Sequence, residues 1–370
     1  MRSGMRTIYD ARVWLFGILS ICLVMTTAGA EFRDARRVKV ADRSPPAKQA
    51  NRGIEGWARV CVTVGADGSV RNPHVVDASP SPEFAEAGRK AAMDWEFEPA
   101  RMGEEAVEEH GSCAVQYFTL DVPSDARSSK RIEEASALLA AEEPDPEAAS
   151  LLLSDLVEQG PLSLRQAAAL QLVEFRIAAG REDLEGALDA IERATVERGR
   201  FLEENQVIGS LSARFSGLMN ARRYREALEL FNGFESMVGG AKPMLVHGEA
   251  AAQIRKLRTS GASFWVPALL GPAPGGGAAQ WRHVPLRREL GVRKLDGNVD
   301  GIEILCERQT LRVDYAEGVS WKIPESWGDC VIWAEGKDGT TFELIEYGPA
   351  EEGAPAGGSE GAEKKDAGGD

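Results

Sequence analysis

The cysteines are the residues of this chain whose chemistry is easiest to define from their number and spacing. Four of the five lie in segments with strand-like patterns, one pair near each end of the chain: Cys61, Cys113, Cys306 and Cys330. None belongs to a Cys-x-x-Cys motif, so a zinc ribbon or a thioredoxin-type site has no support. In an oxidising compartment four cysteines favour two disulfides, for which three connectivities exist. We expect the local pairs, Cys61–Cys113 and Cys306–Cys330.

The N-terminus indicates that compartment. Arg2, Arg6 and Arg12 precede an apolar run over residues 13–25, which contains the fifth cysteine, and small residues follow up to Ala30. A basic flank, a short apolar core and a small-residue ending are typical of a secretory signal peptide. The alternative is an uncleaved membrane anchor, because residues 13–30 are just long enough to span a bilayer. We expect residues 1–30 to be a cleaved signal and the mature protein to reside in the periplasm, with a single-pass inner-membrane location as the alternative.

The sequence contains few residues or motifs that would support catalysis or cofactor binding. Its four histidines, His74, His110, His247 and His283, lie far apart, and no Gly-x-Ser-x-Gly, His-Glu-x-x-His or Walker loop occurs. The formal net charge of -15 disfavours binding to nucleic acid, because the phosphates would be repelled. We therefore expect no catalytic residues, no cofactor and no nucleic-acid partner.

One motif resembles a calcium loop. Asp296-x-Asn298-x-Asp300-Gly301 with Glu307 fits the ligand spacing of an EF-hand. That chemistry needs a helix after the loop, whereas the residues that follow alternate as a strand does. We therefore predict a hairpin turn at Asp296-Gly297 and no metal site.

The elements that position the first cysteine pair form a β-β-α-β pattern within residues 31–125. Residues 57–64 alternate between two faces, and Asp67-Gly68 leads into a second extended run, as in a hairpin. Residues 83–95 have apolar side chains at helical spacing, and a last strand is expected over residues 112–122. The pattern predicts a small antiparallel sheet with one helix on one face, and Trp95 and Phe97 in its core.

These residues resemble the C-terminal domain of TonB, the periplasmic energy transducer of Gram-negative bacteria, over about residues 44–122. The matching motifs are Pro45-Pro46-x-x-x-Ala50, Gly53-Ile54-Glu55-Gly56, Val60-x-Val62-x-Val64, Asp67-Gly68-x-Val70, Val75-Val76-x-Ala78-Ser79, Trp95-x-Phe97-x-Pro99-Ala100 and Phe118-x-Leu120. A TonB transducer places this domain at its C-terminus, after an anchor and a long proline-rich spacer. Here the segment between residues 31 and 43 would reach only about 45 Å, so force transmission to the outer membrane is not expected.

The resemblance implies a binding mode as well as a fold. TonB domains receive a receptor peptide as an added strand, and the final strand of a β-β-α-β unit is a natural sheet edge. We therefore predict that a peptide from an envelope protein pairs along Cys113, Ala114, Val115, Gln116, Tyr117, Phe118 and Thr119. Outward side chains such as Gln116 or Tyr117 would select among peptides. Which of these two residues directs its backbone N–H outward stays open.

The middle segment, residues 126–261, is helical in pattern. Leucine and alanine recur at steps of three and four residues, with glycine and proline between helices. Residues 223–231 resemble the first helix of a tetratricopeptide repeat, while the other helices keep only the alanine and leucine spacing. The segment is expected to be either an α-solenoid that binds proteins on its concave face or a plain helical bundle.

The remaining sequence divides into three parts. Residues 262–280 are predicted to be a linker because of their glycine and proline content, and residues 349–370 a disordered acidic tail. Residues 281–348 alternate as short strands. Trp321, Trp327 and Trp333 of this β-rich module are expected to pack its core rather than to form a sugar or peptide platform.

The sequence as a whole predicts an α+β multidomain protein. Its leading functional hypothesis is an exported, non-enzymatic envelope protein that binds outer-membrane or periplasmic proteins by strand addition, with a link to TonB-dependent transport. The second is a true energy transducer with an uncleaved anchor. The third, a carbohydrate-binding or hydrolytic protein, has the least support.

Overall fold

The computed structural model describes residues 31–40, 43–120, 125–238, 245–274 and 276–349. The N-terminal part comprises β1 (Phe32–Arg33), β2 (Arg36–Lys39), α1 (Ala47–Asn51), β3 (Gly56–Val64), β4 (Val70–Ser79), α2 (Glu83–Ala92), β5 (Glu96–Glu98), β6 (Ala100–Met102), β7 (Glu105–Val107) and β8 (Glu109–Phe118). The predicted signal peptide and acidic tail lie outside these residues. No helix of the described chain is both long and apolar enough to cross a membrane.

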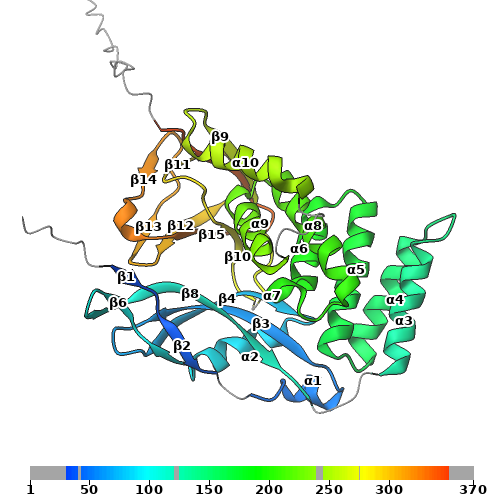
Figure 1. Cartoon of the computed structure of the whole chain (residues 1–370). Helices are drawn as coiled ribbons and strands as arrows, with labels where there is room; N and C mark the ends of the chain where they lie inside the picture. The colour runs from blue at the N-terminus through cyan, green and yellow to red at the C-terminus, as the bar shows by residue number, and fades with distance from the viewer. Residues whose placement is uncertain (1–30, 41–42, 121–124, 239–244, 275, 350–370) are drawn as a thin grey trace, which may run out of the picture.

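The N-terminal part is built on an antiparallel three-stranded sheet in the order β4-β3-β8 (Figure 1). Val60, Val62 and Val64 point from β3 into a core beneath α2, which Trp95 and Phe97 complete. Gly68 turns the β3–β4 hairpin with a φ of 79°, a conformation that glycine adopts without steric cost. The predicted β-β-α-β unit is therefore confirmed, with three short strands inserted between α2 and β8.

The middle of the chain folds into helices that pack in chain order. They are α3 (Ala126–Leu138), α4 (Pro146–Gln159), α5 (Leu164–Gly180), α6 (Leu184–Ala194), α7 (Val196–Gly199), α8 (Glu204–Asn220), α9 (Tyr224–Val238) and α10 (Leu245–Thr259). Asp125, Asp145 and Asp183 cap α3, α4 and α6, because each carboxylate accepts a hydrogen bond from a backbone N–H of the first turn. α6 packs on α8, α8 on α9 and α9 on α10, an order that favours a solenoid over a bundle.

The C-terminal part is two four-stranded antiparallel sheets packed around one core. Its elements are β9 (Phe264–Leu269), β10 (Ala279–His283), β11 (Glu289–Asp296), β12 (Val299–Cys306), β13 (Gln309–Val313), β14 (Ser320–Lys322), the 3-10 helix η2 (Glu325–Trp327), β15 (Cys330–Gly336) and β16 (Thr341–Glu346). The sheets have the strand orders β10-β15-β12-β13 and β14-β11-β16-β9. Trp321 and Trp327 are half-buried against this core, as expected. The expectation for Trp333 is wrong: it is buried on the opposite face of β15 from the core residues Ile332 and Ala334, where it stacks on His74 of β4.

Two further expectations for this part are wrong. Residues 264–269 of the predicted linker form β9, which pairs with β16; Pro267 is tolerated there because β9 is an edge strand. Asp296-Gly297 does not make a hairpin, since β11 and β12 belong to different sheets. Gly297 instead turns a corner between the sheets with a φ of 112°, where a Cβ atom would lie 2.5 Å from Thr340 Oγ1.

Polar contacts hold the three parts together. Arg193 of α6 pairs with Asp77 of β4 at 3.0 Å, and Arg225 of α9 pairs with Asp329 at 2.6 Å, just before β15. Within the helical part, Glu192 of α6 accepts hydrogen bonds from Arg214 and Arg223. His74 of β4 stacks on Trp333 of β15, with ring centroids 5.3 Å apart. The helices therefore pack on the sheet face opposite α2, and the C-terminal strands contact β4.

Candidate functional site

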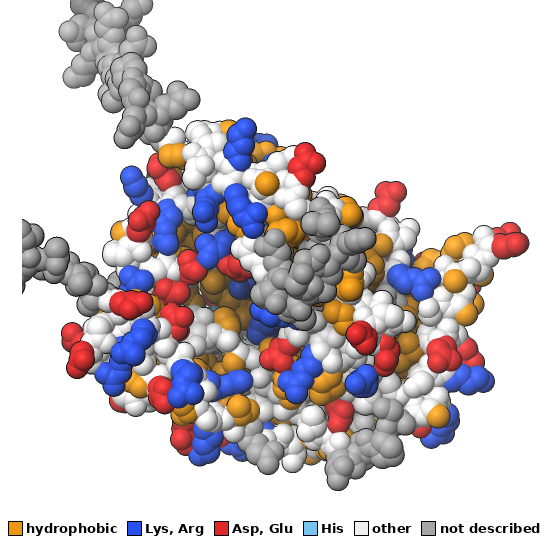
Figure 2. All heavy atoms as spheres, in the orientation of Figure 1, with side chains coloured by type: hydrophobic (Ala, Val, Ile, Leu, Met, Phe, Trp, Pro, Cys, Tyr) orange, Lys and Arg blue, Asp and Glu red, His pale blue; other side chains and the backbone are white. Residues whose placement is uncertain are grey.

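The predicted docking strand lies at an edge of its sheet. β8 pairs with β3 on one side only. Within the described ranges, Cys113, Val115 and Tyr117 make no backbone–backbone hydrogen bond to any element other than β3. Figure 2 shows a recess on this face of the molecule, between the sheet, the helices and the C-terminal strands. An extended segment could therefore reach the edge of β8 from this side.

The register of the β3–β8 pair decides which residues direct their backbone outward. Cys61 lies directly opposite Cys113, with Cα atoms 3.9 Å apart. So short a separation identifies a non-hydrogen-bonded pair, because hydrogen-bonded pairs in antiparallel sheets are wider, about 5.5 Å. Since the pattern alternates, Cys113, Val115 and Tyr117 turn their N–H and C=O groups away from β3. Tyr117, rather than Gln116, therefore carries the outward N–H.

The expectation that the Gln116 side chain points outward is wrong. Gln116 is 2% exposed, on the side of the sheet that faces α2. Its Oε1 accepts a hydrogen bond from Trp95 Nε1 at 3.0 Å, and its Nε2 donates to the Tyr117 carbonyl at 2.8 Å. Because Gln116 and Trp95 are both buried, these hydrogen bonds hold the Gln116 amide in place. Gln116 therefore has a structural role in the core beneath β8.

Both ends of the open edge are closed by contacts within the chain. The His110 N–H donates to the Glu307 carbonyl at 2.8 Å, so the loop after β12 already occupies the start of β8. The Leu120 N–H donates to Glu55 Oε1 at 2.8 Å. An added strand is therefore confined to the stretch between these two residues, which contains the predicted residues Cys113 to Thr119.

Both predicted disulfides are confirmed. Cys61–Cys113 joins β3 to β8, and Cys306–Cys330 joins β12 to β15. Each connects adjacent antiparallel strands at directly opposed positions. The first of them links β8 to β3, the central strand of its sheet.

The Tyr117 end of the edge has side chains that the sequence did not single out. The Tyr117 ring packs edge-on against Phe201 with centroids 5.3 Å apart, and the Arg200 guanidinium lies 5.3 Å from the same ring. The Arg37 guanidinium lies 4.8 Å from the Trp95 ring. Burial lowers the pKa of Arg37, and burial followed by the nearby Glu197 carboxylate raises the pKa of Tyr117. In the sequence, only the basic pair Arg36-Arg37 marks this region. The pair does not show which of the two arginines lies against the Trp95 ring.

Glu109, at the other end of β8, predicts that the stability of the folded protein depends on pH. Its carboxylate accepts a hydrogen bond from the Ala35 N–H; burial first, then the charges of Asp34 and Glu307, raise its pKa to about 7. The folded state therefore keeps a proton that the unfolded state loses above pH 4.5, so stability falls as the pH rises from about 4.5 to 7.

We expect this loss to be about 1–2 kcal/mol after solvent screening near the surface, and Glu109→Gln to remove it. The measurement is urea unfolding of both proteins between pH 4.5 and 8. Glu108→Gln, at an exposed carboxylate beside it, is the control and should keep the wild-type slope. An unchanged slope in Glu109→Gln would contradict the assignment.

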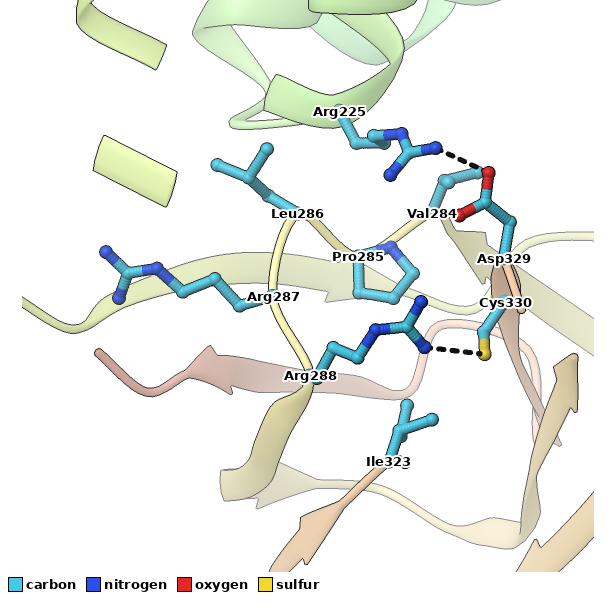
Figure 3. A pocket seen from close by; sticks show the side chains of 9 residues that line it. All are labelled: Arg225, Val284, Pro285, Leu286, Arg287, Arg288, Ile323, Asp329 and Cys330. Carbon is cyan, nitrogen blue, oxygen red and sulfur yellow. Dashed lines mark hydrogen bonds and ion pairs between the residues drawn. The ribbon is translucent and has the colours of Figure 1, made fainter. Parts of the chain in front are cut away.

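Two cavities lie away from this edge in the described part of the chain. One of about 30 Å³, the volume of a single water molecule, lies beside the loop between β10 and β11 (Figure 3). Its arginines are engaged, Arg225 with Asp329 at 2.6 Å and Arg288 with the Gly328 carbonyl at 2.8 Å. A second, of about 280 Å³, is an open surface depression between α2, β4 and β15. No group of three or more His, Cys, Asp or Glu side chains in the described part of the chain could hold a metal ion.

Comparison with known proteins finds a similarity for the part of the chain that contains the β4-β3-β8 sheet. A search of the curated proteins finds no match to the chain. Among solved structures, the solution NMR structure of the Pseudomonas aeruginosa TonB CTD shares 27% identity, covers 24% of this chain and 90% of its own, and gives a TM-score of 0.20. Residues 45–118, about a fifth of the chain, match the family described as Gram-negative bacterial TonB protein C-terminal. The chain thus carries a TonB C-terminal-like domain, whose last strand is β8.

Proposed function

We propose that this protein is an exported, non-enzymatic component of the cell envelope that binds another envelope protein by strand addition at β8. The observation that carries the proposal is the outward backbone of Cys113, Val115 and Tyr117 at the edge of a TonB C-terminal-like sheet. Unpaired backbone groups at a sheet edge pair readily with an extended segment. Of these three residues Cys113 is exposed, Tyr117 is half-buried with its carbonyl bonded by Gln116 Nε2, and Val115 is buried. The signal-like N-terminus and the two disulfides support a periplasmic location.

Proline at Tyr117 tests this proposal. Tyr117→Pro removes the outward N–H and places a ring where the added strand would lie, so we expect partner binding to weaken by about 1–3 kcal/mol, roughly 5- to 150-fold. The partner is first captured in cells through a photo-crosslinking residue at the exposed Thr119, with the same residue at Leu184, 64% exposed on α6, as control.

The purified partner is then titrated against wild type and Tyr117→Pro. Circular dichroism and non-reducing mass measurement establish that the variant keeps its fold and both disulfides. Equal affinity in a folded variant would reject strand addition at β8 and leave the concave face of the helices as the preferred surface.

A true energy transducer is the second candidate, favoured by the apolar run at residues 13–30, which is long enough to span a bilayer. It requires that this run stays attached. Sequencing the mature N-terminus distinguishes the two: a chain that starts at Glu31 favours the exported binding protein, whereas an intact Met1 in the membrane fraction favours the transducer.

A further inference from the structure

Arg59, in the middle of β3, lies where the three parts of the chain meet. It is directly opposite Asp77 of β4, and its side chain leaves the sheet on the face that turns toward the helices. Within the described ranges the Arg59 guanidinium forms no hydrogen bond and no ion pair; both oxygens of Asp77 accept from Arg193 Nε instead, at 3.0 and 3.3 Å. Arg59 is half-buried, so its charge is partly removed from water without a hydrogen-bonded counter-ion.

The charges near Arg59 do not neutralise it. Arg214 of α8 and Arg282 of β10 repel the guanidinium, whereas the carboxylates of Glu192 and Asp77 attract it. Burial, followed by Arg214, lowers the pKa of Arg59, so the surroundings as a whole disfavour its positive charge. With two cations and two carboxylates around it, the charge of Arg59 itself is left over. A ligand with one negative charge would neutralise it.

Arg282 reaches the same region from the C-terminal part. It lies directly opposite Trp333 in the β10–β15 pair, so the two side chains share one face of that sheet. Trp333 stacks on His74, and His74 lies opposite Cys61, which is two residues after Arg59 on the same face of β3. The stack therefore brings the two arginines to one site, which exists only where the N-terminal sheet and the C-terminal strands meet.

Solvent reaches this junction. Figure 2 shows a recess between the sheet, the helices and the C-terminal strands, and these three parts supply Arg59, Arg214 and Arg282. The Arg282 side chain is 24% exposed, and its Nη1 lies 3.6 Å from Glu226, longer than a hydrogen bond. Both Arg59 and Arg282 thus keep donors for a small molecule that enters the recess.

A carboxylate suits these donors better than a phosphate. A guanidinium donates two parallel hydrogen bonds to a carboxylate, whose single charge matches the one left over at Arg59. A phosphate monoester carries nearly two charges at neutral pH and would be repelled by Asp77 and Glu192. The half-buried His74 ring beside the arginines offers an aromatic surface to the body of the ligand.

We propose that this recess binds a small aromatic carboxylic acid, whose carboxylate pairs with Arg59 and is attracted by Arg282 and Arg214. The ligand is a free acid rather than a protein segment, because these side chains project from the face of the sheet and not along the open edge of β8. The inference does not depend on strand addition at that edge.

A fluorine NMR titration of para-fluorobenzoate into the chain of residues 31–370 tests the site. We expect saturable binding to wild type, and Arg59→Gln should weaken it at least about tenfold because the paired hydrogen bonds are lost. Arg282→Gln, which removes a charge but no direct contact, should weaken it about threefold. Arg71→Gln is the matched control, since Arg71 is an exposed arginine of β4 that pairs with Glu108 at 3.1 Å; it should bind like wild type.

Two further probes define what the site recognises. The neutral para-fluorobenzamide has nearly the same shape and should not displace the acid, and inorganic phosphate at equal concentration should displace little of it. If the amide binds as well as the acid, or if phosphate displaces the acid from wild type, the assignment to a carboxylate is wrong. The absence of saturable para-fluorobenzoate binding to wild type would overturn the inference as a whole.

Urea unfolding separates a binding role of Arg59 from a structural one. Without ligand, Arg59→Gln should unfold at the same urea concentration as wild type or a higher one, because glutamine removes an uncompensated charge. Saturating para-fluorobenzoate should raise the midpoint of wild type and leave that of Arg59→Gln unchanged. If Arg59→Gln unfolds at lower urea without ligand, Asp77 and Glu192 already compensate Arg59, and the inference fails. Arg59→Lys, which keeps the charge, should bind with intermediate affinity.

Discussion

Glu192→Gln should lower the free energy of unfolding by about 3–5 kcal/mol, the cost of breaking a buried ion pair from one side. Glu192 Oε1 lies 3.1 Å from Arg214 Nη2, and its Oε2 lies 3.0 Å from Arg223 Nη1. Glutamine keeps the shape of the side chain and removes the charge. Arg223 would then keep Glu226 at 2.6 Å, whereas Arg214 would lose the carboxylate with which it pairs.

Urea unfolding at pH 7 measures the effect, with Glu96→Gln as control. Glu96 forms a shorter but exposed ion pair with Lys39, at 2.5 Å, so its removal should cost less than about 1 kcal/mol. Equal losses in the two variants would show that the buried cluster contributes no more than a surface pair.

The same cluster predicts a response to acid. Burial alone would raise the pKa of Glu192, but Arg223 and Arg214 lower it overall. A carboxylate with a lowered folded-state pKa stabilises the protein above its ordinary pKa, and this stability is lost as the pH falls through the folded-state value. Glu192→Gln should therefore differ most from wild type near neutral pH and least in strong acid.

Replacing both Cys61 and Cys113 by alanine should lower the free energy of unfolding by about 4 kcal/mol. The two residues are 52 apart in sequence, and their bond restricts the unfolded chain over that loop. The corresponding change at Cys306 and Cys330, 24 residues apart, should cost somewhat less, about 3.5 kcal/mol.

Mass measurement under non-reducing conditions comes first and should find no free thiol at these four cysteines. Denaturant unfolding of the two double variants then gives the stability changes. Thiol labelling of the unreduced, denatured chain at Cys61 or Cys113 would contradict the bond. A Cys61–Cys113 variant as stable as wild type would show that β8 is held by its backbone pairing alone.

The sequence by itself determined the local structure of this protein, because strand alternation and turn residues are patterns of residues close together in the chain. Alternation over residues 57–64 with Asp67-Gly68 was enough for the β3–β4 hairpin, because strand period and turn residues act within one short segment. The two disulfides followed because the four cysteines fall as one pair near each end of the chain, on segments with strand patterns. The ordered motifs up to Trp95-x-Phe97 identified the TonB-like domain.

Only the tertiary structure decided what depends on distant segments. β9 became a strand because β16, about 75 residues later, pairs with it, and the corner at Asp296-Gly297 arose because β11 and β12 joined different sheets. Alternation tells which face of a strand is buried, but not which strand is its partner or which edge is left open. For the same reason, no local pattern encodes the hydrogen bond from Trp95 to the buried Gln116 or the position of Arg200 over the Tyr117 ring.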